Sequence, residues 1–329
     1  MVMNSTIRHF DSIDCVKLLM AVVVVGIHTL PAETFLEGIS CCVSAIYSLA
    51  VPFFFVTSGF FLGSKIKGSA REEQLAYLRK WLRRLGRLYI LWTAIYLPYA
   101  IYGFSLEQLG FTKTLAVYVR NILLVGENYW SWPLWYLLAM FVAGCMIYLL
   151  SRFKIKQIYW YIFAIAFAIA GILLDELRAN DWGWVNLYYS IFKTTRNGLF
   201  VGFPYIALGL FVSSYGIRLS KLSLLALIAI GFASQLFDVP LSNHITIYAL
   251  FSLLLSINLP TRKDDLYINV RLSSSVIYFT HMLWVGLLHL FFPEILALSL
   301  FATAVLLSSL TAAAAVRYKE QGVVKLLFR

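Results

Sequence analysis

The stretch IDCVKLLMAVVVVGIHTLPA, residues 13 to 32, is almost entirely apolar. About 20 apolar residues in a helix are needed to cross a hydrocarbon core about 30 Å thick. Runs of similar length and composition recur along the chain, and we predict that each forms a helix. There are ten such runs, at residues 13–32, 41–62, 85–104, 132–151, 158–175, 195–213, 222–239, 244–259, 272–292 and 297–316.

The composition of the whole chain agrees with a membrane environment. Of 329 residues, 61% are hydrophobic and 13% are charged, and the mean hydropathy is +0.79. Ordinary soluble domains have about 45–50% apolar and about 25% charged residues, so a soluble globule is excluded, as is a disordered chain. The segments between the runs are too short to bury a core of their own. We therefore predict one all-α, polytopic membrane domain over residues 1–329.

A different kind of segment follows the third run. Between Leu106 and Val125, apolar residues alternate with Glu107, Lys113 and Arg120. Such mixing is typical of an amphipathic helix that lies in the membrane interface. The prediction is thus about ten transmembrane helices plus one interfacial helix.

The basic residues are distributed unequally between alternate loops. With the N-terminus inside, 22 of the 27 Lys and Arg residues fall on the inner side. Basic residues near helix ends are retained in the cytoplasm, so both termini are predicted to be cytoplasmic. The net charge of +11 then reflects topology, and no nucleic-acid partner is predicted.

The first run contains three ionisable residues, Asp14, Lys17 and His28. The eleven-residue step from Lys17 to His28 turns about 1100°, within about 20° of whole turns, so both lie on one helix face, about 16 Å apart. Such residues are expensive in a membrane and need a partner or a function. One interpretation is a polar line in which His28 is a general base and Lys17 and Asp14 orient it or stabilise charge. The other is an i,i+3 ion pair of Asp14 with Lys17, plus a hydrogen-bonded His28.

Five motifs together resemble the integral membrane acyltransferase 3 family. Lys17, ten intervening residues and His28 resemble the Arg/Lys-x10-His signature of that family. The others are VPFFFVTSGFF at 51–61, RRLGRLY at 83–89, LWYL at 134–137 and IYFTH at 277–281. The resemblance covers nearly the whole chain. It implies transfer of an acyl group, usually acetyl from acetyl-CoA, to sugars or other cell-envelope acceptors at a bacterial cytoplasmic membrane.

One variant of the family is more similar still. IHTLP at 27–31, the 51–61 motif and TRNGLF at 195–200 resemble the membrane domain of VanT-type serine/alanine racemases. The chain ends thirteen residues after Val316, so the expectation is that the racemase domain is absent and that racemisation is excluded. The resemblance leaves a serine-binding or transport bundle as the alternative to an enzyme.

A basic stripe enters the third run. Lys80, Arg83, Arg84 and Arg87 recur at three- and four-residue steps, so they share one helix face. Cations in this arrangement suit the phosphates of coenzyme A, and we predict Arg83, Arg84 and Arg87 as the donor site. The alternative is ordinary positive-inside anchoring of the helix.

Six residues are predicted to bind the acceptor. Trp135 and Tyr136 follow from the resemblance, whereas the sequence alone indicates an outer aromatic belt. Arg196 stands with Asn197 at the outer end of its run, where an arginine can hold a carboxylate or phosphate, or can anchor the helix end. Tyr278 and His281 also follow from the resemblance, although a buried histidine is more often a core residue. The six are Trp135, Tyr136, Arg196, Asn197, Tyr278 and His281.

The sequence therefore predicts a multi-pass O-acyltransferase, of the class that transfers groups other than aminoacyl groups. The donor would be acetyl-CoA or another acyl-CoA on the cytoplasmic side. The acceptor would be a hydroxyl of an envelope glycan or a small molecule. The four cysteines lack any CxxC spacing, so no metal site is predicted.

Overall fold

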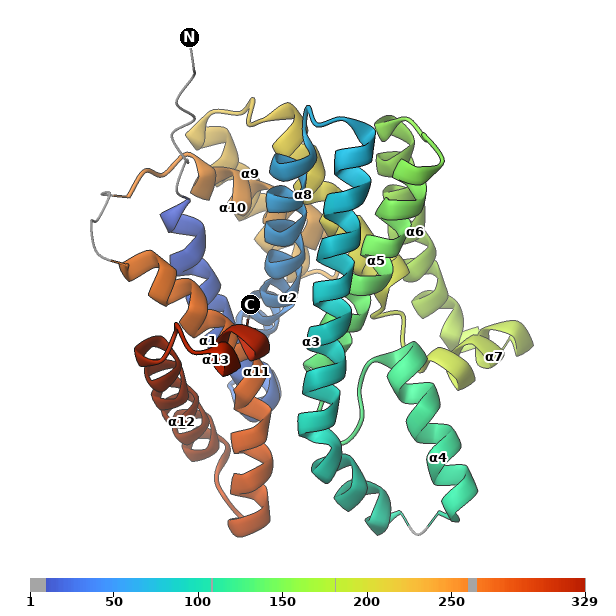
Figure 1. Cartoon of the computed structure of the whole chain (residues 1–329), viewed down its shortest axis with the longest axis vertical. Helices are drawn as coiled ribbons and strands as arrows, with labels where there is room; N and C mark the ends of the chain where they lie inside the picture. The colour runs from blue at the N-terminus through green and yellow to red at the C-terminus, as the bar shows by residue number, and fades with distance from the viewer. Residues whose placement is uncertain (1–9, 108, 181, 260–264, 329) are drawn as a thin grey trace.

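The computed structural model describes residues 10–107, 109–180, 182–259 and 265–328. Over these ranges the chain forms a bundle of helices without a strand (Figure 1). Four basic residues that entered the topology prediction lie outside the described residues, namely Arg8, Arg262, Lys263 and Arg329.

All ten predicted apolar runs are helical. They are α1 (Asp11–Thr29), α2 (Glu37–Ile66), α3 (Arg71–Leu106), α5 (Leu134–Arg152), α6 (Gln157–Leu177), α8 (Phe203–Tyr215), α9 (Lys221–Gln235), α10 (Ser242–Leu255), α11 (Leu266–Phe291) and α12 (Ala297–Arg317). Eight are long and apolar enough to cross a membrane, where α8 is taken together with the π-helical turn η4 (Gly198–Gly202) before it. The all-α, multi-pass fold is confirmed.

The two remaining helices are shorter. α9 has 15 residues and α10 has 14, which is about 22 Å of helix at 1.5 Å per residue and less than the core of a bilayer. The number of ten spans and the cytoplasmic position of both termini therefore stay predictions.

Short helices outside the spans differ in part from the prediction. The segment predicted at the interface begins inside α3, which continues to Leu106, and its helix is α4 (Phe111–Arg120), followed by the π-turn η2 (Asn121–Val125). α4 is amphipathic, and its residues Phe111 and Leu115 are exposed. α7 (Gly183–Phe192) and α13 (Gly322–Phe328) were not predicted, because both are too short to show in a 20-residue pattern.

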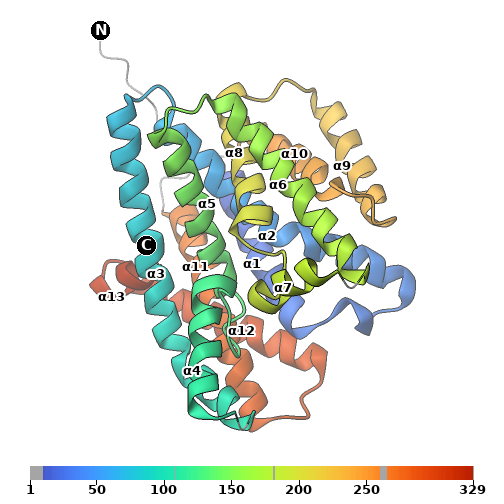
Figure 2. The same ribbon diagram turned by 90° about the vertical axis from the view of Figure 1, so that its right-hand side faces the viewer.

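Tyrosines and a tryptophan hold α11 and the chain end against α3. The hydroxyls of Tyr96 and Tyr99 donate to the carbonyl oxygens of Phe279 and Leu283, each at 2.8 Å. The indole Nε1 of Trp92 donates to the Leu327 carbonyl at 2.9 Å, so α13 packs against α3 (Figure 2).

α2 and α8 cross in backbone contact. A Cβ atom on Gly59 would overlap the carbonyl oxygen of Ile206, and one on Gly209 would overlap that of Val56. Small residues permit such close approach between membrane helices, where packing rather than hydrophobic burial drives association. This contact fixes α2, which carries much of the cavity described below.

We predict that Gly59→Ala sharply lowers the yield and thermal stability of the folded protein, because the added methyl group forces α2 away from α8. Gly38→Ala, in the same helix but with no atom within 4 Å of its Cβ position, is the matched control and should behave as the parent. Size-exclusion profiles and melting curves in detergent measure both. Equal behaviour of the two variants would contradict the close crossing.

Candidate functional site

Asp14, at the start of α1, is paired principally with Arg271 of α11. Its carboxylate is 1% exposed and accepts from the Arg271 guanidinium, with Nε–Oδ1 at 3.0 Å and Nη2–Oδ2 at 2.6 Å. The predicted pair with Lys17 is present but longer, at 4.0 Å. Arg271 was not predicted as a partner, because no local sequence pattern relates two residues that are 257 positions apart.

The Lys17 end of α1 lies near a basic cavity. Lys17 is within electrostatic range of Arg84 of α3 as well as of Arg271. Arg84 lines a cavity of about 510 Å³. The other lining residues also come from one face of α3, and they are Tyr77, Lys80, Trp81, Arg83 and Arg87. The predicted basic stripe thus forms a concave, cationic surface with two aromatic rings, which is suited to a nucleotide polyphosphate.

His28, at the other end of α1, lines a second and larger cavity of about 940 Å³. Its ring centroid is 5.5 Å from those of Trp132 and His281. Among the described residues no hydrogen bond to its imidazole is found. His28 is therefore free to bond a ligand in this cavity, as a general base requires.

Three of the six predicted acceptor residues line this cavity together with His28. They are Trp135, Arg196 and Tyr278. The Arg196 guanidinium lies over the Trp135 ring, 5.8 Å from its centroid. The Tyr278 hydroxyl donates to the carbonyl oxygen of Pro133 at 3.0 Å, so toward a ligand it can act only as an acceptor.

His281 does not line the cavity, which favours the core interpretation of this residue. It is fully buried behind His28, and its Nδ1 lies 2.8 Å from the Tyr278 carbonyl oxygen and 3.1 Å from that of Ile277. A carbonyl only accepts, so Nδ1 carries the proton. His281 thus contributes a ring that packs on His28.

Tyr136 and Asn197 also lie outside the cavity lining. Tyr136 is buried, with its hydroxyl 3.4 Å from Ser58 Oγ. Asn197 is the N-cap of η4, because its Oδ1 accepts from the backbone N–H groups of Leu199 and Phe200. Its side-chain amide also donates to Tyr188 at 2.8 Å, so Asn197 has a structural role, and its contact with the acceptor stays a prediction.

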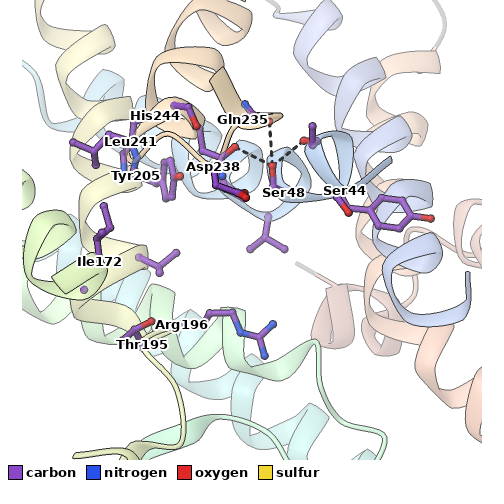
Figure 3. Close-up of a pocket in the computed structure, with 18 of the residues that line it drawn as sticks. Ser44, Ser48, Ile172, Thr195, Arg196, Tyr205, Gln235, Asp238, Leu241 and His244 are labelled. Atoms are coloured by element: carbon purple, nitrogen blue, oxygen red, sulfur yellow. Dashed lines mark hydrogen bonds between the residues drawn. The ribbon is translucent and has the colours of Figure 1, made fainter. Parts of the chain in front are cut away.

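The opposite wall of the cavity is polar and was not predicted (Figure 3). Ser48 Oγ of α2 lies 2.9 Å from Asn243 Oδ1 and 3.3 Å from Gln235 Oε1. His244 of α10 stacks on Tyr205 of α8 at 4.2 Å. In the sequence, the polar residues Gln235, Asn243 and His244 lie around the junction of two apolar runs. An ordinary turn between two helices has a similar composition, so this cluster did not indicate a cavity wall.

Comparison with known proteins gives one family and several relatives. A family model described as an acyltransferase domain matches residues 10–318. A serine/alanine racemase of Enterococcus gallinarum is 27% identical over 66% of this chain and 31% of its own length. An amino-acid racemase of Enterococcus faecalis is 26% identical over 78% of this chain and 33% of its own. The chain thus spans about a third of these relatives, and no solved structure matches it significantly.

We predict that Arg271→Ala destabilises the protein more than Lys17→Ala, because only the first leaves the buried Asp14 carboxylate without its bidentate partner. Breaking a fully buried pair costs about 3–5 kcal/mol. Since the Arg271 side chain is half exposed, we expect about 1–3 kcal/mol here. Thermal melting of both variants, and of Arg271→Ala combined with Asp14→Asn, measures this. A larger loss in Lys17→Ala would show that Lys17 is the dominant partner.

Proposed function

Since this chain belongs to the acyltransferase 3 family, we propose that it is an O-acyltransferase moving an acyl group, in the first instance acetyl, from cytoplasmic acyl-CoA to a hydroxyl of a cell-envelope acceptor. The observation that carries the proposal is the placement of α1. Lys17 at one end lies near the basic cavity, and His28 at the other end lines the large cavity.

The basic cavity suits the donor. Coenzyme A carries a diphosphate and a 3′-phosphate, and Arg83, Arg84, Arg87 and Lys80 offer four cations on one wall. Trp81 offers an aromatic surface for the adenine. Lys17 and His28 are about 16 Å apart along α1, so the pantetheine arm would have to extend along the bundle for its thioester to meet the acceptor.

The large cavity suits the acceptor, and His28 supplies the base. The acceptor hydroxyl oxygen attacks the thioester carbonyl carbon as His28 takes the hydroxyl proton. The tetrahedral intermediate collapses, the C–S bond breaks, and the coenzyme A thiolate leaves and takes up a proton. The products are an ester and free coenzyme A, so atoms and charge balance without a metal or an oxidant.

A second function, binding or transport of an amino acid such as serine, is favoured by one observation. The lining of the large cavity carries both signs of charge, with Arg196 on one wall and Asp238 and Glu176 elsewhere around it. A zwitterion needs such a pair of charges. The racemase relatives support this second proposal, since their printed activities concern amino acids.

For the donor site, we predict that Arg83→Gln combined with Arg84→Gln weakens acetyl-CoA binding at least about tenfold, because each charged contact contributes about 1.5–3 kcal/mol. Calorimetry in detergent measures the affinity. Lys154→Gln combined with Lys156→Gln removes two exposed cations between α5 and α6 and is the matched control. If both double variants bind acetyl-CoA as tightly as the parent does, the basic residues of α3 only determine the membrane topology.

For the base, we predict that His28→Ala lowers the rate of acyl transfer about 10²- to 10⁴-fold while folding and acetyl-CoA binding stay near normal. His289→Ala removes an imidazole that packs on Trp130 instead and should transfer at the parent rate. Proteoliposomes given labelled acetyl-CoA or labelled serine report the two activities. If serine uptake depends on His28 and the parent transfers no acyl group to any acceptor supplied, the acyltransferase function is refuted and the transport function is supported.

A further inference from the structure

The short segment that carries Arg196 is fixed by hydrogen bonds on both sides of that residue. On one side, the buried Thr195 hydroxyl donates to Asp175 Oδ2 of α6 at 2.7 Å. On the other, the Asn197 amide donates to the Tyr188 hydroxyl of α7 at 2.8 Å, and that hydroxyl donates to the Thr194 carbonyl at 3.1 Å. Thr194, Thr195 and Asn197, which flank Arg196 on both sides, are thus hydrogen-bonded to α6 and α7.

Asp175 is itself held in place. Its Oδ1 accepts from the Tyr189 hydroxyl at 2.5 Å, and the Arg178 guanidinium lies over the Tyr189 ring, 4.5 Å from its centroid. Burial and the neighbouring Asp175 carboxylate raise the pKa of Tyr189, so the phenol keeps its proton and donates. Because both carboxylate oxygens accept from hydroxyl groups, the charge of Asp175 serves to orient the segment.

The Arg196 side chain leaves this fixed segment and extends into the cavity (Figure 3). Its guanidinium lies over Trp135, 5.8 Å away, and no carboxylate within 4.0 Å pairs with it in the described parts of the chain. Glu127 is one acid within electrostatic range of Arg196: burial raises the pKa of Glu127, whereas Arg196 and Lys193 lower it. Stacking fixes the plane of a guanidinium and leaves its N–H edge available for a bidentate ligand.

Arg196 is also within electrostatic range of His28 in the same cavity. An arginine that only anchors a helix end snorkels toward lipid headgroups. Arg196 lies instead on a cavity wall over an aromatic ring, and this placement favours binding of a ligand over anchoring.

We propose that Arg196 binds an anionic group of the acceptor, a carboxylate or a phosphate, while a hydroxyl of the same molecule lies at His28, and that Asp175 is the positioning residue for this arginine. The inference rests on the proposed function, since it takes the ligand of the cavity to be the acceptor. It makes the acceptor a hydroxylated anion, of which acidic sugars and phosphosugars are the envelope examples tested below.

The test compares three sugars that differ in charge: methyl glucoside, glucuronate and glucose 6-phosphate. Binding is measured by saturation-transfer NMR and calorimetry in detergent, and acetyl transfer is measured separately. We expect the parent to bind at least one anionic sugar about 10- to 100-fold more tightly than methyl glucoside. Comparison of the two anionic sugars distinguishes carboxylate from phosphate.

Arg196→Gln should abolish that preference and leave methyl glucoside binding unchanged, whereas Arg196→Lys should keep a part of it. Asp175→Asn, which keeps one carbonyl oxygen for Thr195, should raise KM for the anionic sugar about three- to tenfold with kcat unchanged, and Asp175→Ala should raise it further. Glu33→Gln, which changes an exposed acid that does not line the cavity, is the control.

Equal binding of all three sugars by the parent, binding of none, or an unchanged preference in Arg196→Gln would overturn the proposal. A fall in kcat and stability for every sugar alike in Asp175→Asn would reduce Asp175 to a structural residue. Charge-selective binding without acyl transfer would refute the proposed function and uphold the anion site. Acyl transfer without charge-selective binding would uphold the proposed function and refute the anion site.

Discussion

An ionisable side chain within a bilayer must have a charged or hydrogen-bonding partner, or must face a polar cavity. Beyond its first residue, Asp11, α1 carries three such residues, Asp14, Lys17 and His28, and a neighbouring helix contributes a side chain beside each of them. α11 provides Arg271 for Asp14 at one end and packs His281 against His28 at the other. α3 brings Arg84 within range of Lys17. The positions of α3 and α11 around α1 therefore depend on the ionisable side chains of α1.

The large cavity depends on backbone features that would be costly elsewhere in a membrane. α9 and α10 are shorter than the eight candidate spans, and the segment that connects them contributes Asp238 and Leu241 to the cavity lining. Irregular backbone at depth is tolerated where it borders such a polar space. Pro52 of α2 lines the same cavity, and a proline inside a helix leaves the carbonyl four residues earlier, that of Ser48, without its helical donor.

In the proposed function, the two cavities bind the donor and the acceptor near opposite ends of α1. Four cations on α3 line the smaller cavity, whereas hydroxyls, amides and aromatic rings line the larger one together with aliphatic side chains. The proposed charged donor and polar acceptor would then be recognised separately, and the proposed transfer would take place near His28. The crossing of Gly59 and Gly209 keeps α2 and α8, which form walls of the larger cavity, in one relative position.

Length, hydropathy and helical period by themselves determined a large part of this protein. They predicted the helices, the shared face of Lys17 and His28, and the basic face of α3, because each is a property of residues a few positions apart. Only the tertiary structure decided which distant residues meet. Arg271 with Asp14, the polar wall from Ser48 to His244, and the capping role of Asn197 all depend on contacts between separate elements. Local pattern carries no information on such contacts, since packing between helices determines which side chains share a cavity.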